Sequence, residues 1–322
     1  MDKIMRTTLI SGGAGFIGSH LCDHFLGKGH KVICIDNMST GNRKFIISKK
    51  NNKNFIFIKK DLASMQIPDF PKIRISNILH FASPASPPDY IKFPFMSLHA
   101  GSVGTMVLLK LTKKHNARFL LASTSEIYGD PHVHPQKESY WGNVNPIGPR
   151  SVYDEAKRFA EAYAMACKRH MGLNIKIIRI FNTYGPRMRL NDGRALPNFM
   201  SQALRGDPIT IYGDGKQTRS LCYITDLIDG IEKVLYNNYG NPINLGNPEE
   251  VTIYDLAQRI KIITKSKSKI IFEPLPIDDP KRRCPDISLA KKILGWNPEV
   301  SLDNGLSLSL RYFKETLSGE PR

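Results

Sequence analysis

Tyr153 and Lys157 could perform acid–base chemistry together because they lie four residues apart. The surrounding segment, residues 151–161, predicts the start of a helix, which would put both side chains on one face about one turn apart. A lysine ammonium close to a phenol favours the phenolate and lowers the phenol pKa from about 10. Such a phenolate can accept a proton from a hydroxyl group while hydride leaves the same carbon. The pair also fits an ordinary exposed helix face, so its interpretation depends on the elements around it.

A glycine-rich turn near the amino terminus predicts a dinucleotide site. Residues 7–10 form a β-rich run, residues 21–26 have a helical pattern, and the turn between them has the spacing G-x-x-G-x-x-G. The residues of this turn that we expect to bind the dinucleotide are Gly12, Gly15, Phe16, Ile17 and Gly18. Glycine permits the tight turn and lets backbone N–H groups approach a pyrophosphate at a helix N-terminus. A tight strand–helix turn without a ligand is the alternative.

An acidic residue ends the second predicted strand, residues 31–36. Asp36, with Asn37 after it, can accept hydrogen bonds from a ribose 2′-OH and would repel a 2′-phosphate, so the sequence favours NAD over NADP. Arg43 lies close by in the sequence and slightly weakens that preference.

The third and fourth predicted strands, residues 54–58 and 77–82, also end in candidate ligands. Ligands of open α/β sheets bind beyond the carboxyl ends of the strands. The candidates after these strands are Asp61 and Leu62, expected near the adenine, and Ala82 and Pro84 in a proline-rich loop. An ordinary loop aspartate is the alternative for Asp61.

Polar residues close the fifth predicted strand, residues 118–123. They are Thr124, Ser125 and Glu126. Polar side chains at the end of a buried strand are unfavourable unless they are hydrogen bonded. Together with Tyr153 and Lys157 they would place hydroxyls, a carboxylate, a phenol and an ammonium beside a nicotinamide site. A hydrogen-bonded loop anchor is the alternative interpretation.

The alternation of strands and helices predicts an α/β protein with a Rossmann-type doubly wound parallel sheet. The chain of 322 residues, 41% hydrophobic and 23% charged, suits one large domain or two of ordinary size. We expect an NAD-binding domain over residues 1–180, with later returns around residues 220–247, and a smaller, interleaved α/β substrate domain mainly over residues 181–322. Further helices are predicted at residues 98–115, 194–204, 223–232, 252–258, 288–294 and 302–317, with threonine caps at the starts of the third and fourth.

The formal net charge of +17 is high. Nucleic-acid binding is one interpretation of such a charge. The lysines are spread along the chain without a long basic block, however, so attraction of a small anionic substrate is the more modest inference, and we expect no nucleic-acid partner.

The five cysteines are scattered and show no Cys-x-x-Cys spacing: Cys22, Cys34, Cys167, Cys222 and Cys284. This distribution predicts reduced thiols in a cytoplasmic protein rather than a disulfide framework or a zinc site, and we expect no metal. The sequence also lacks an apolar run of the roughly 20 residues that span a bilayer, so we expect no membrane partner. Its first residues run directly into a predicted strand, so we expect no signal peptide.

The sequence resembles the extended short-chain dehydrogenase/reductase family over nearly its whole length. The glycine turn and the Tyr-x-x-x-Lys spacing mark the broad family. Within it, several segments resemble the branch that decarboxylates UDP-glucuronate: residues 81–88, 123–131, 140–148, 153–157, 181–188, 213–219 and 278–286. Sister 4,6-dehydratases usually carry Asp where this chain has Ser125.

The resemblance implies a role for each candidate. Tyr153 would deprotonate a sugar 4-hydroxyl, Lys157 would lower the phenol pKa and hold the nicotinamide ribose, and Thr124 would bind the 4-oxygen. The residues implied near the sugar carboxylate are Ser125, Glu126 and Arg283. The substrate-binding candidates are Pro84, Asn182, Asn198, Tyr212, Arg219 and Arg283, with Asn182 and Arg219 at the diphosphate and Tyr212 at the uracil.

Three residues depart from the family pattern. Pro149 and Ala156 replace an expected Val and Gly, and Cys284 stands where Lys is common. Ala156 should preserve the helix. Cys284 adjoins Arg283 and bears on the register of that arginine.

The implied activity is NAD-dependent decarboxylation of UDP-glucuronate to UDP-xylose through a 4-keto intermediate, with NAD recycled. Glu126 beside a substrate carboxylate would be a like-charge pair, which could expel carbon dioxide or raise one pKa. A homodimer formed through the Tyr–Lys helix is also implied. The alternatives are a related sugar-nucleotide 4-epimerase or 4,6-dehydratase and, from another class, a non-catalytic NAD-binding sensor.

Overall fold

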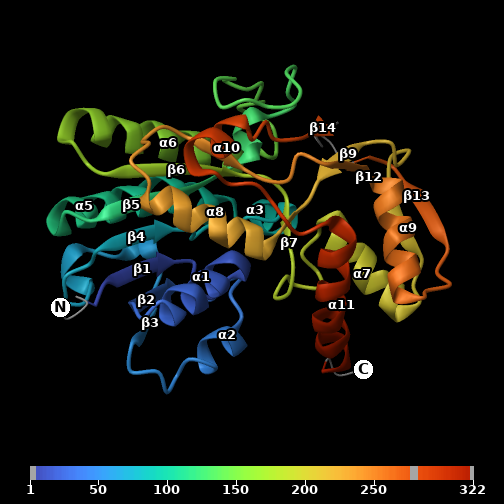
Figure 1. The fold of residues 1–322 in the computed structure, drawn as a ribbon, viewed down its shortest axis with the longest axis horizontal. Coiled ribbons are helices and arrows are strands. Elements are labelled where there is room, and N and C mark those ends of the chain that lie inside the picture. The colour runs from blue at the N-terminus through green and yellow to red at the C-terminus, as the bar shows by residue number, and fades with distance from the viewer. Residues whose placement is uncertain (1–4, 276–281, 320–322) are drawn as a thin grey trace.

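A seven-stranded parallel sheet forms the centre of the molecule (Figure 1). The computed structural model describes residues 5–275 and 282–319. In spatial order the strands are β11 (Ile243–Leu245), β6 (Ile175–Ile180), β5 (Arg118–Thr124), β4 (Asn77–His80), β1 (Thr7–Ser11), β2 (Lys31–Asp36) and β3 (Phe55–Lys59). All neighbouring pairs are parallel. The predicted Rossmann-type α/β fold is therefore confirmed, and the strands of the amino-terminal half lie within two residues of their predicted ranges.

Adjacent residues along these strands are buried on opposite faces of the sheet, which explains their continuous apolar sequence. Leu9 belongs to the core on one face and Ile10 to the core on the other. The covering helices are α1 (Phe16–Gly27) and α8 (Ile224–Tyr236) on the Ile10 face, and α5 (Thr105–His115) and α6 (Ser151–Met171) on the Leu9 face. Because helices cover both faces, a ligand must approach at the ends of the strands.

The sheet reverses its direction of winding between β1 and β4. The chain passes through β1, β2 and β3 toward one edge, and β4 then returns to the other side of β1. In open α/β sheets ligands bind at such a switch point, beyond the carboxyl ends of the strands. The segments that follow β1 and β4 are in close contact here, since a Cβ on Gly12 would lie 2.6 Å from the carbonyl oxygen of Phe81.

The helix predicted over residues 98–115 is interrupted by a wider turn. Helix α4 (Pro94–His99) leads into the π-helical segment η3 (Ala100–Gly104), and α5 follows. This segment packs closely on α6, because a Cβ on Gly101 would lie 2.7 Å from the carbonyl oxygen of Ala156. The glycine at position 101 leaves room for Ala156, the residue that departs from the glycine expected on α6.

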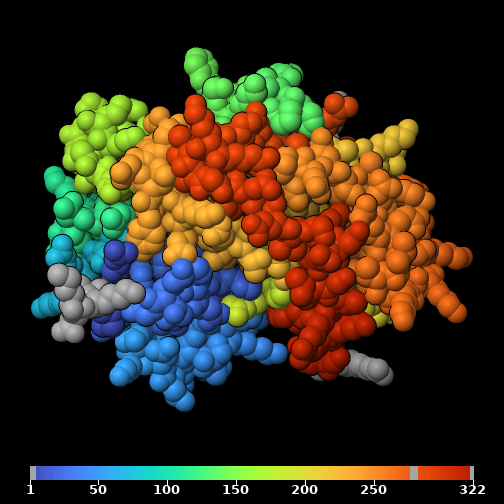
Figure 2. Space-filling view, viewed as in Figure 1, coloured from blue at the N-terminus to red at the C-terminus, as the bar shows by residue number. Residues whose placement is uncertain are grey.

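Later parts of the chain build a smaller group of elements beside the sheet (Figure 1). Its helices α7 (Ala195–Arg205), α9 (Ile253–Thr264) and α11 (Leu302–Ser318) pack together. Its strands are β8 (Ile209–Tyr212) with β13 (Ile270–Glu273), and β9 (Thr218–Ser220) between β12 (Glu250–Thr252) and β14 (Arg282–Arg283). The carboxyl-terminal segment, which includes α10 (Ser288–Leu294), forms the red surface between the blue amino-terminal half and the orange segments in Figure 2. The division into two domains near residue 180 stays a prediction.

Short elements complete the described chain. The helical ones are α2 (Arg43–Ile47), α3 (Pro87–Lys92), η1 (Leu62–Ser64), η2 (Ile67–Asp69) and η4 (Ser125–Tyr128), and the strands are β7 (Thr183–Tyr184) and β10 (Cys222–Tyr223). All five cysteines are buried and free, as predicted. Among the described residues, no helix is both long enough and apolar enough to cross a membrane.

One of the two predicted threonine caps is confirmed and the other is wrong. The Thr252 side chain accepts a hydrogen bond from the Asp255 N–H at the start of α9, at 3.0 Å. Helix α8, in contrast, has Tyr223 as its N-cap residue, without a capping side chain. Pairing of β10 with β7 keeps the chain extended through Tyr223, so the helix begins too early for Thr225 to cap it.

Candidate active site

A cavity of about 440 Å³ extends from the switch point of the sheet to the smaller group of elements. Every residue predicted to bind cofactor or substrate or to act in catalysis lines it. The cofactor candidates are Gly12, Gly15, Phe16, Ile17, Gly18, Asp36, Asn37, Asp61, Leu62 and Ala82; the catalytic candidates are Thr124, Ser125, Glu126, Tyr153, Lys157 and Arg283; and the other substrate candidates are Pro84, Asn182, Asn198, Tyr212 and Arg219. The structure thus brings the candidates together in one cavity, while the role of each stays a prediction.

The glycine turn has the shape that a dinucleotide pyrophosphate requires. Gly12 adopts a φ of 75°, in the left-handed region that glycine tolerates best. Gly15 is the N-cap residue of α1. Because glycine has no side chain to accept hydrogen bonds from the first-turn N–H groups, those donors are available to an anionic ligand.

Asp36 is held rigidly at the end of β2. Its carboxylate accepts hydrogen bonds from the backbone N–H groups of Ala14, at 3.0 Å, and Met38, at 2.8 Å. Burial raises the pKa of Asp36 above its ordinary value. Arg43 lies exposed on α2, outside the cavity lining. These positions fit a ribose 2′-OH better than a 2′-phosphate, so the cavity suits NAD.

Asp61 connects the ends of the second and third strands. Its carboxylate accepts a hydrogen bond from the Asn37 side chain at 2.9 Å and another from the backbone N–H of Ala63 at 2.8 Å. Both acidic residues of this part of the cavity are therefore fixed by local hydrogen bonds.

The predicted acid–base pair is buried beneath the end of β5. Tyr153 is 6% exposed and Lys157 is 5% exposed. The Lys157 ammonium lies 5.6 Å from the centre of the Tyr153 ring and donates a hydrogen bond to the Ala122 carbonyl oxygen at 2.9 Å. The lysine is thus anchored to the strand while staying beside the phenol.

Burial controls the pKa values of this pair. It raises the pKa of Tyr153 above its ordinary value, and the hydrogen bond with Thr124 offsets the effect only in part. The lowering of the Tyr153 pKa predicted from the Lys157 spacing does not appear here, because desolvation of the phenolate outweighs the hydrogen bond with Thr124 and the nearby charge of Arg194. The same desolvation lowers the pKa of Lys157 to about 8.

Tyr90 is a residue of the site that the sequence analysis missed. Its ring stacks on that of Tyr153, with centroids 5.2 Å apart and planes inclined by 10°. The ring is buried, it lines the cavity, and its hydroxyl has no hydrogen-bond partner among the described residues. The position of Tyr90, directly after the proline-rich loop at the end of β4, could have indicated that it belongs to the site.

Two arginines neutralise Glu126. Arg150 Nη2 lies 2.5 Å from one oxygen of the carboxylate, and Arg283 Nη1 lies 2.8 Å from the other. Burial alone would raise the pKa of Glu126, but the two guanidinium groups outweigh it and lower the pKa to about 2. Glu126, Arg150 and Arg283 together carry one more positive than negative charge, and the Asp154 carboxyl, which interacts with all three, has its pKa raised to about 7. Arg150 precedes Tyr153 by three residues, a spacing that could have indicated it.

Arg283 also connects neighbouring segments at the bottom of the site. It is 2% exposed and donates hydrogen bonds to the Ser125 hydroxyl at 3.1 Å and the Gly129 carbonyl oxygen at 3.0 Å. Arg282 is exposed instead. Arg283 rather than Arg282 therefore faces the site, while its role stays a prediction, and residues 278–281 of the segment that suggested it lie outside the described residues.

The part of the cavity formed by the smaller group of elements and the segment after β6 holds the predicted substrate ligands. The predicted ligands there are Asn182 after β6, Asn198 on α7, Tyr212 at the end of β8 and Arg219 on β9. Three further arginines, which the sequence analysis did not select, also line the cavity, and each forms an ion pair with an aspartate: Arg187, Arg189 and Arg194. Tyr212 is 44% exposed, so its ring can stack with a planar ligand. This end of the cavity suits a diphosphate attached to a base.

The fold and the site together define an extended short-chain dehydrogenase/reductase, with the glycine turn at the switch point and the Tyr–Lys pair at the end of β5. Residues 9–308 match the model of the family described as GDP-mannose 4,6 dehydratase, and the chain belongs to that family.

The chain is also similar to individual proteins and solved structures. The chain is 48% identical over 316 residues to UDP-glucuronic acid decarboxylase 1 of Danio rerio, covering 98% of this chain and 74% of that protein. A UDP-glucose 4-epimerase from Thermotoga maritima, solved with UDP-glucose, has a TM-score of 0.89 and 30% identity, covering 97% of this chain and 99% of that one. A UDP-glucuronic acid 4-epimerase mutant from Bacillus cereus, solved with UDP-4-deoxy-4-fluoro-glucuronic acid and NAD, has a TM-score of 0.83 and 29% identity, covering 96% and 99%.

Proposed function

We propose that this protein is an NAD-dependent decarboxylase that converts UDP-glucuronate to UDP-xylose through a 4-keto intermediate. The observation that carries the proposal is the cluster of Glu126 with Arg150 and Arg283, whose net positive charge lies in the same cavity as Tyr153 and Thr124. A sugar with a carboxylate for the cationic cluster and a hydroxyl for Tyr153 and Thr124 matches this arrangement. The similarity to UDP-glucuronic acid decarboxylase 1 supports the same substrate.

The cofactor is NAD, held by the glycine turn and by Asp36. Bound there, NAD would supply a hydride acceptor for sugar carbon 4, and its positive charge would favour the phenolate form of Tyr153. The backbone N–H groups after Gly15 bind the pyrophosphate, and Asp36 accepts hydrogen bonds from the adenosine ribose. Lys157, anchored to Ala122, is positioned to donate to the nicotinamide ribose.

Tyr153 acts as the base. Its phenolate takes the proton of the sugar 4-hydroxyl as the carbon–hydrogen bond at carbon 4 breaks. Thr124, whose hydroxyl lies within hydrogen-bonding reach of Tyr153, turns its one hydrogen to the same sugar oxygen when the substrate is bound. The two groups therefore hold the 4-oxygen in both its hydroxyl and its ketone forms.

Decarboxylation follows from the position of the new ketone, which is β to the carboxylate. The bond between carbons 5 and 6 breaks, carbon dioxide leaves, and the electron pair passes through carbon 5 to the 4-oxygen as an enolate. Donors at that oxygen, Thr124 and protonated Tyr153, stabilise the developing charge. Arg150 and Arg283 bind the carboxylate before it leaves, and Glu126 limits how tightly they hold it. A proton from solvent water then adds at carbon 5. Tyr153 finally returns its proton to the 4-oxygen as carbon 4 regains hydride, which gives the 4-hydroxyl of UDP-xylose.

A 4-epimerase is the principal rival, because solved structures similar to this chain include 4-epimerases. The cationic cluster would have no use in an epimerase that acts on UDP-glucose, whereas an epimerase that acts on UDP-glucuronic acid would share it, and product identity separates that second case from a decarboxylase. A 4,6-dehydratase would instead act on a sugar that carries a 6-hydroxyl. A non-catalytic NAD sensor would not require Tyr153, Lys157 and Thr124 to converge.

Product mass distinguishes these functions. Purified protein is incubated with NAD and either UDP-glucuronate or UDP-glucose, and the nucleotide sugars are analysed by mass spectrometry. We expect UDP-glucuronate to lose the mass of one carbon dioxide and UDP-glucose to remain unchanged. An isomer of unchanged mass would favour an epimerase, loss of water from UDP-glucose a dehydratase, and no conversion despite tight NAD binding a sensor.

We also propose that the protein is a homodimer formed through α6. Phe159 on this helix is 42% exposed and stacks on Tyr163, which gives an aromatic surface suited to a second copy. The five free cysteines support a reducing compartment, and we propose the cytoplasm.

A further inference from the structure

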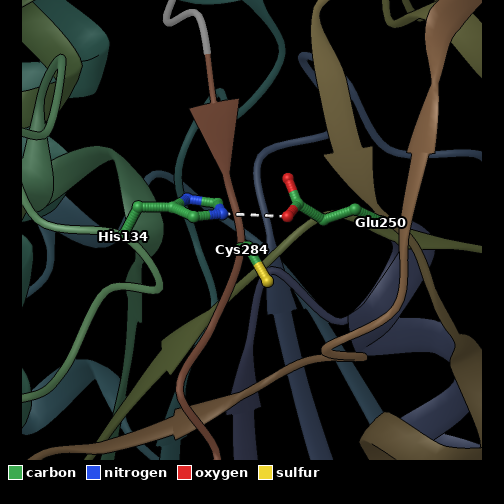
Figure 3. A group of neighbouring side chains, drawn as sticks. All are labelled: His134, Glu250 and Cys284. Atoms are coloured by element: carbon green, nitrogen blue, oxygen red, sulfur yellow. Dashed lines mark hydrogen bonds and ion pairs between the residues drawn. The ribbon is translucent and has the colours of Figure 1, made fainter.

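Three side chains with metal-binding atoms meet beside the active-site cavity: His134, Glu250 and Cys284 (Figure 3). Their ligand atoms all lie within 4.8 Å of one another. His134 Nε2 lies 2.9 Å from a carboxylate oxygen of Glu250. In Figure 3 these two side chains approach from opposite sides, and the Cys284 sulfur lies beside the line that joins them.

The pairing of β12, β9 and β14 places Glu250 and Cys284 side by side across the small sheet. Strands β12 and β14 pair with opposite edges of β9, with Glu250 opposite Ser220 and Arg283 opposite Arg219. Cys284, the residue after Arg283, therefore lies level with Glu250.

The loop that carries His134 is fixed to the same strand by Gln136. The Gln136 side chain accepts a hydrogen bond from the Cys284 N–H at 2.9 Å, and the Gln136 N–H donates to the Cys284 carbonyl oxygen at 2.9 Å. Gln136 is fully buried. The cluster is thus preorganised by backbone hydrogen bonds rather than by flexible side chains alone.

The types of ligand indicate which ions would bind. Imidazole, carboxylate and thiolate together suit zinc and similar thiophilic transition metals, whereas magnesium and calcium prefer oxygen ligands alone. The side chains of His134 and Glu250 are each 28% exposed, while Cys284 is 2% exposed, so an ion can enter from solvent and reach the thiol at the inner end. Thr218 donates a hydrogen bond of 2.5 Å to the other oxygen of Glu250, which orients the carboxylate as outer partners of metal ligands do.

We propose that His134, Glu250 and Cys284 form a binding site for a thiophilic divalent cation such as Zn²⁺, with water as a fourth ligand. On binding, the Cys284 thiol releases its proton to solvent, and the hydrogen bond between His134 and Glu250 opens so that both residues can ligate. Tetrahedral zinc places its ligand atoms roughly 3.4–3.8 Å from one another, so small side-chain movements suffice.

The proposed site differs from the expectation of no zinc site, which rested on the absence of Cys-x-x-Cys spacing. His134 and Glu250 are 116 residues apart in the sequence, so local spacing could not reveal the cluster. The ion would connect the His134 loop to the strands β12 and β14, and β14 carries Arg283. The site does not depend on the proposed function, because it involves none of the residues assigned to the reaction.

Cobalt provides a direct test, because a thiolate bound to Co²⁺ gives a ligand-to-metal charge-transfer absorption in the near ultraviolet. Titration of the full-length protein with Co²⁺ is expected to produce this absorption at one equivalent, and Zn²⁺ is expected to remove it by displacement. Cys284→Ala should abolish the absorption. His134→Gln and Glu250→Gln should each weaken binding by about tenfold or more.

Two variants serve as matched controls. His24 and Glu232 form a similar pair at 2.8 Å but are not part of a three-ligand group in the described structure, so His24→Gln should not change cobalt binding. Cys167→Ala, which removes a different buried thiol, should not change it either.

The proposal is overturned if wild-type protein shows no thiolate absorption at millimolar Co²⁺, or if Cys284→Ala retains it. Circular dichroism checks the folding of each variant. If Cys284→Ala does not fold, His134→Gln decides the question, because its side chain is partly exposed. Unchanged cobalt affinity and an unchanged increase in Tm with Zn²⁺ in that variant would also refute the site.

Discussion

At the residue scale, the account depends on one phenol. Tyr153→Phe removes the group that accepts the substrate proton but keeps the ring that stacks on Tyr90. We expect turnover of UDP-glucuronate to fall by about 10²-fold or more, while NAD affinity stays within a few-fold of wild type. Steady-state kinetics and NAD titration measure the two effects. Tyr163→Phe, which changes another tyrosine on α6, should behave as wild type. Normal turnover by Tyr153→Phe would refute the assignment of the base.

The stability of the protein should depend on the ionisation of Asp154. This residue is 5% exposed, and one of its carboxylate oxygens has no hydrogen-bond partner among the described residues. Burial, followed by repulsion from Glu126, raises the pKa of Asp154 to about 7. A raised carboxyl pKa means that the folded state binds the proton more tightly than the unfolded state. The contribution of Asp154 to stability therefore falls as pH rises from about 4 to 7.

Thermal denaturation across this pH range tests the effect. The side chain of Asp154→Asn cannot ionise. As pH rises from about 4 to 7, the Tm of the variant should therefore increase relative to that of wild type, which corresponds to a gain of roughly 1 kcal/mol or more in relative free energy of unfolding. Asp214→Asn, at a site 67% exposed, should follow the wild-type curve. Parallel curves for Asp154→Asn and wild type would contradict the predicted linkage.

The residues that the sequence revealed are those whose chemistry is local. Tyr153 and Lys157 could be predicted from their spacing, and Thr124 from its place at the end of a strand. The raised pKa of Tyr153 could not, because it depends on how many atoms of other segments surround the phenol. Tyr90 and Arg150 lie close in sequence to predicted features, but their roles follow from tertiary contacts, of Tyr90 with Tyr153 and of Arg150 with Glu126.

At the scale of elements, the contact between η3 and α6 positions the acid–base pair. A side chain on Gly101 would overlap the backbone of Ala156, which lies between Tyr153 and Lys157. Gly101→Ala should therefore lower stability by about 1–3 kcal/mol and turnover by roughly 10–100-fold. Thermal denaturation and kinetics measure these effects. Gly27→Ala, where a Cβ would meet no atom within 4 Å, is the matched control. Wild-type values for Gly101→Ala would show that this contact does not position the pair.

The elements themselves were largely predictable because the strands of a buried parallel sheet form continuous apolar runs. The errors arose where tertiary contacts decide local structure. Pairing of β10 with β7 moved the start of α8 away from Thr225. Packing on α6 accompanies a π-helical segment within a helix whose apolar spacing predicts regular geometry.

At the scale of the whole molecule, the α6 surface should determine the oligomeric state. Phe159→Asp places a charge on this exposed aromatic surface, where it should prevent association without disturbing the core. We expect wild-type protein to be a dimer and Phe159→Asp a monomer in size-exclusion chromatography with light scattering. Phe272→Asp changes an exposed phenylalanine on β13, at 55% exposure, and should remain dimeric. A monomeric wild type, or a dimeric Phe159→Asp, would exclude this interface.

Long-range organisation was the part least accessible from the sequence. The order of the strands and the meeting of Arg283 with Ser125, 158 residues apart, arise from the folded chain. The sequence pointed to Arg283 only through the family resemblance. The His134–Glu250–Cys284 cluster, which no resemblance suggested, became visible only in three dimensions.

The fate of sugar carbon 6 tests the central claim most directly. UDP-glucuronate labelled at carbon 6 is incubated with the protein and NAD, and the label is measured in released carbon dioxide and in the nucleotide sugar. The account predicts one labelled carbon dioxide for each UDP-xylose formed, with no net accumulation of NADH. Label retained in an isomeric nucleotide sugar would contradict it.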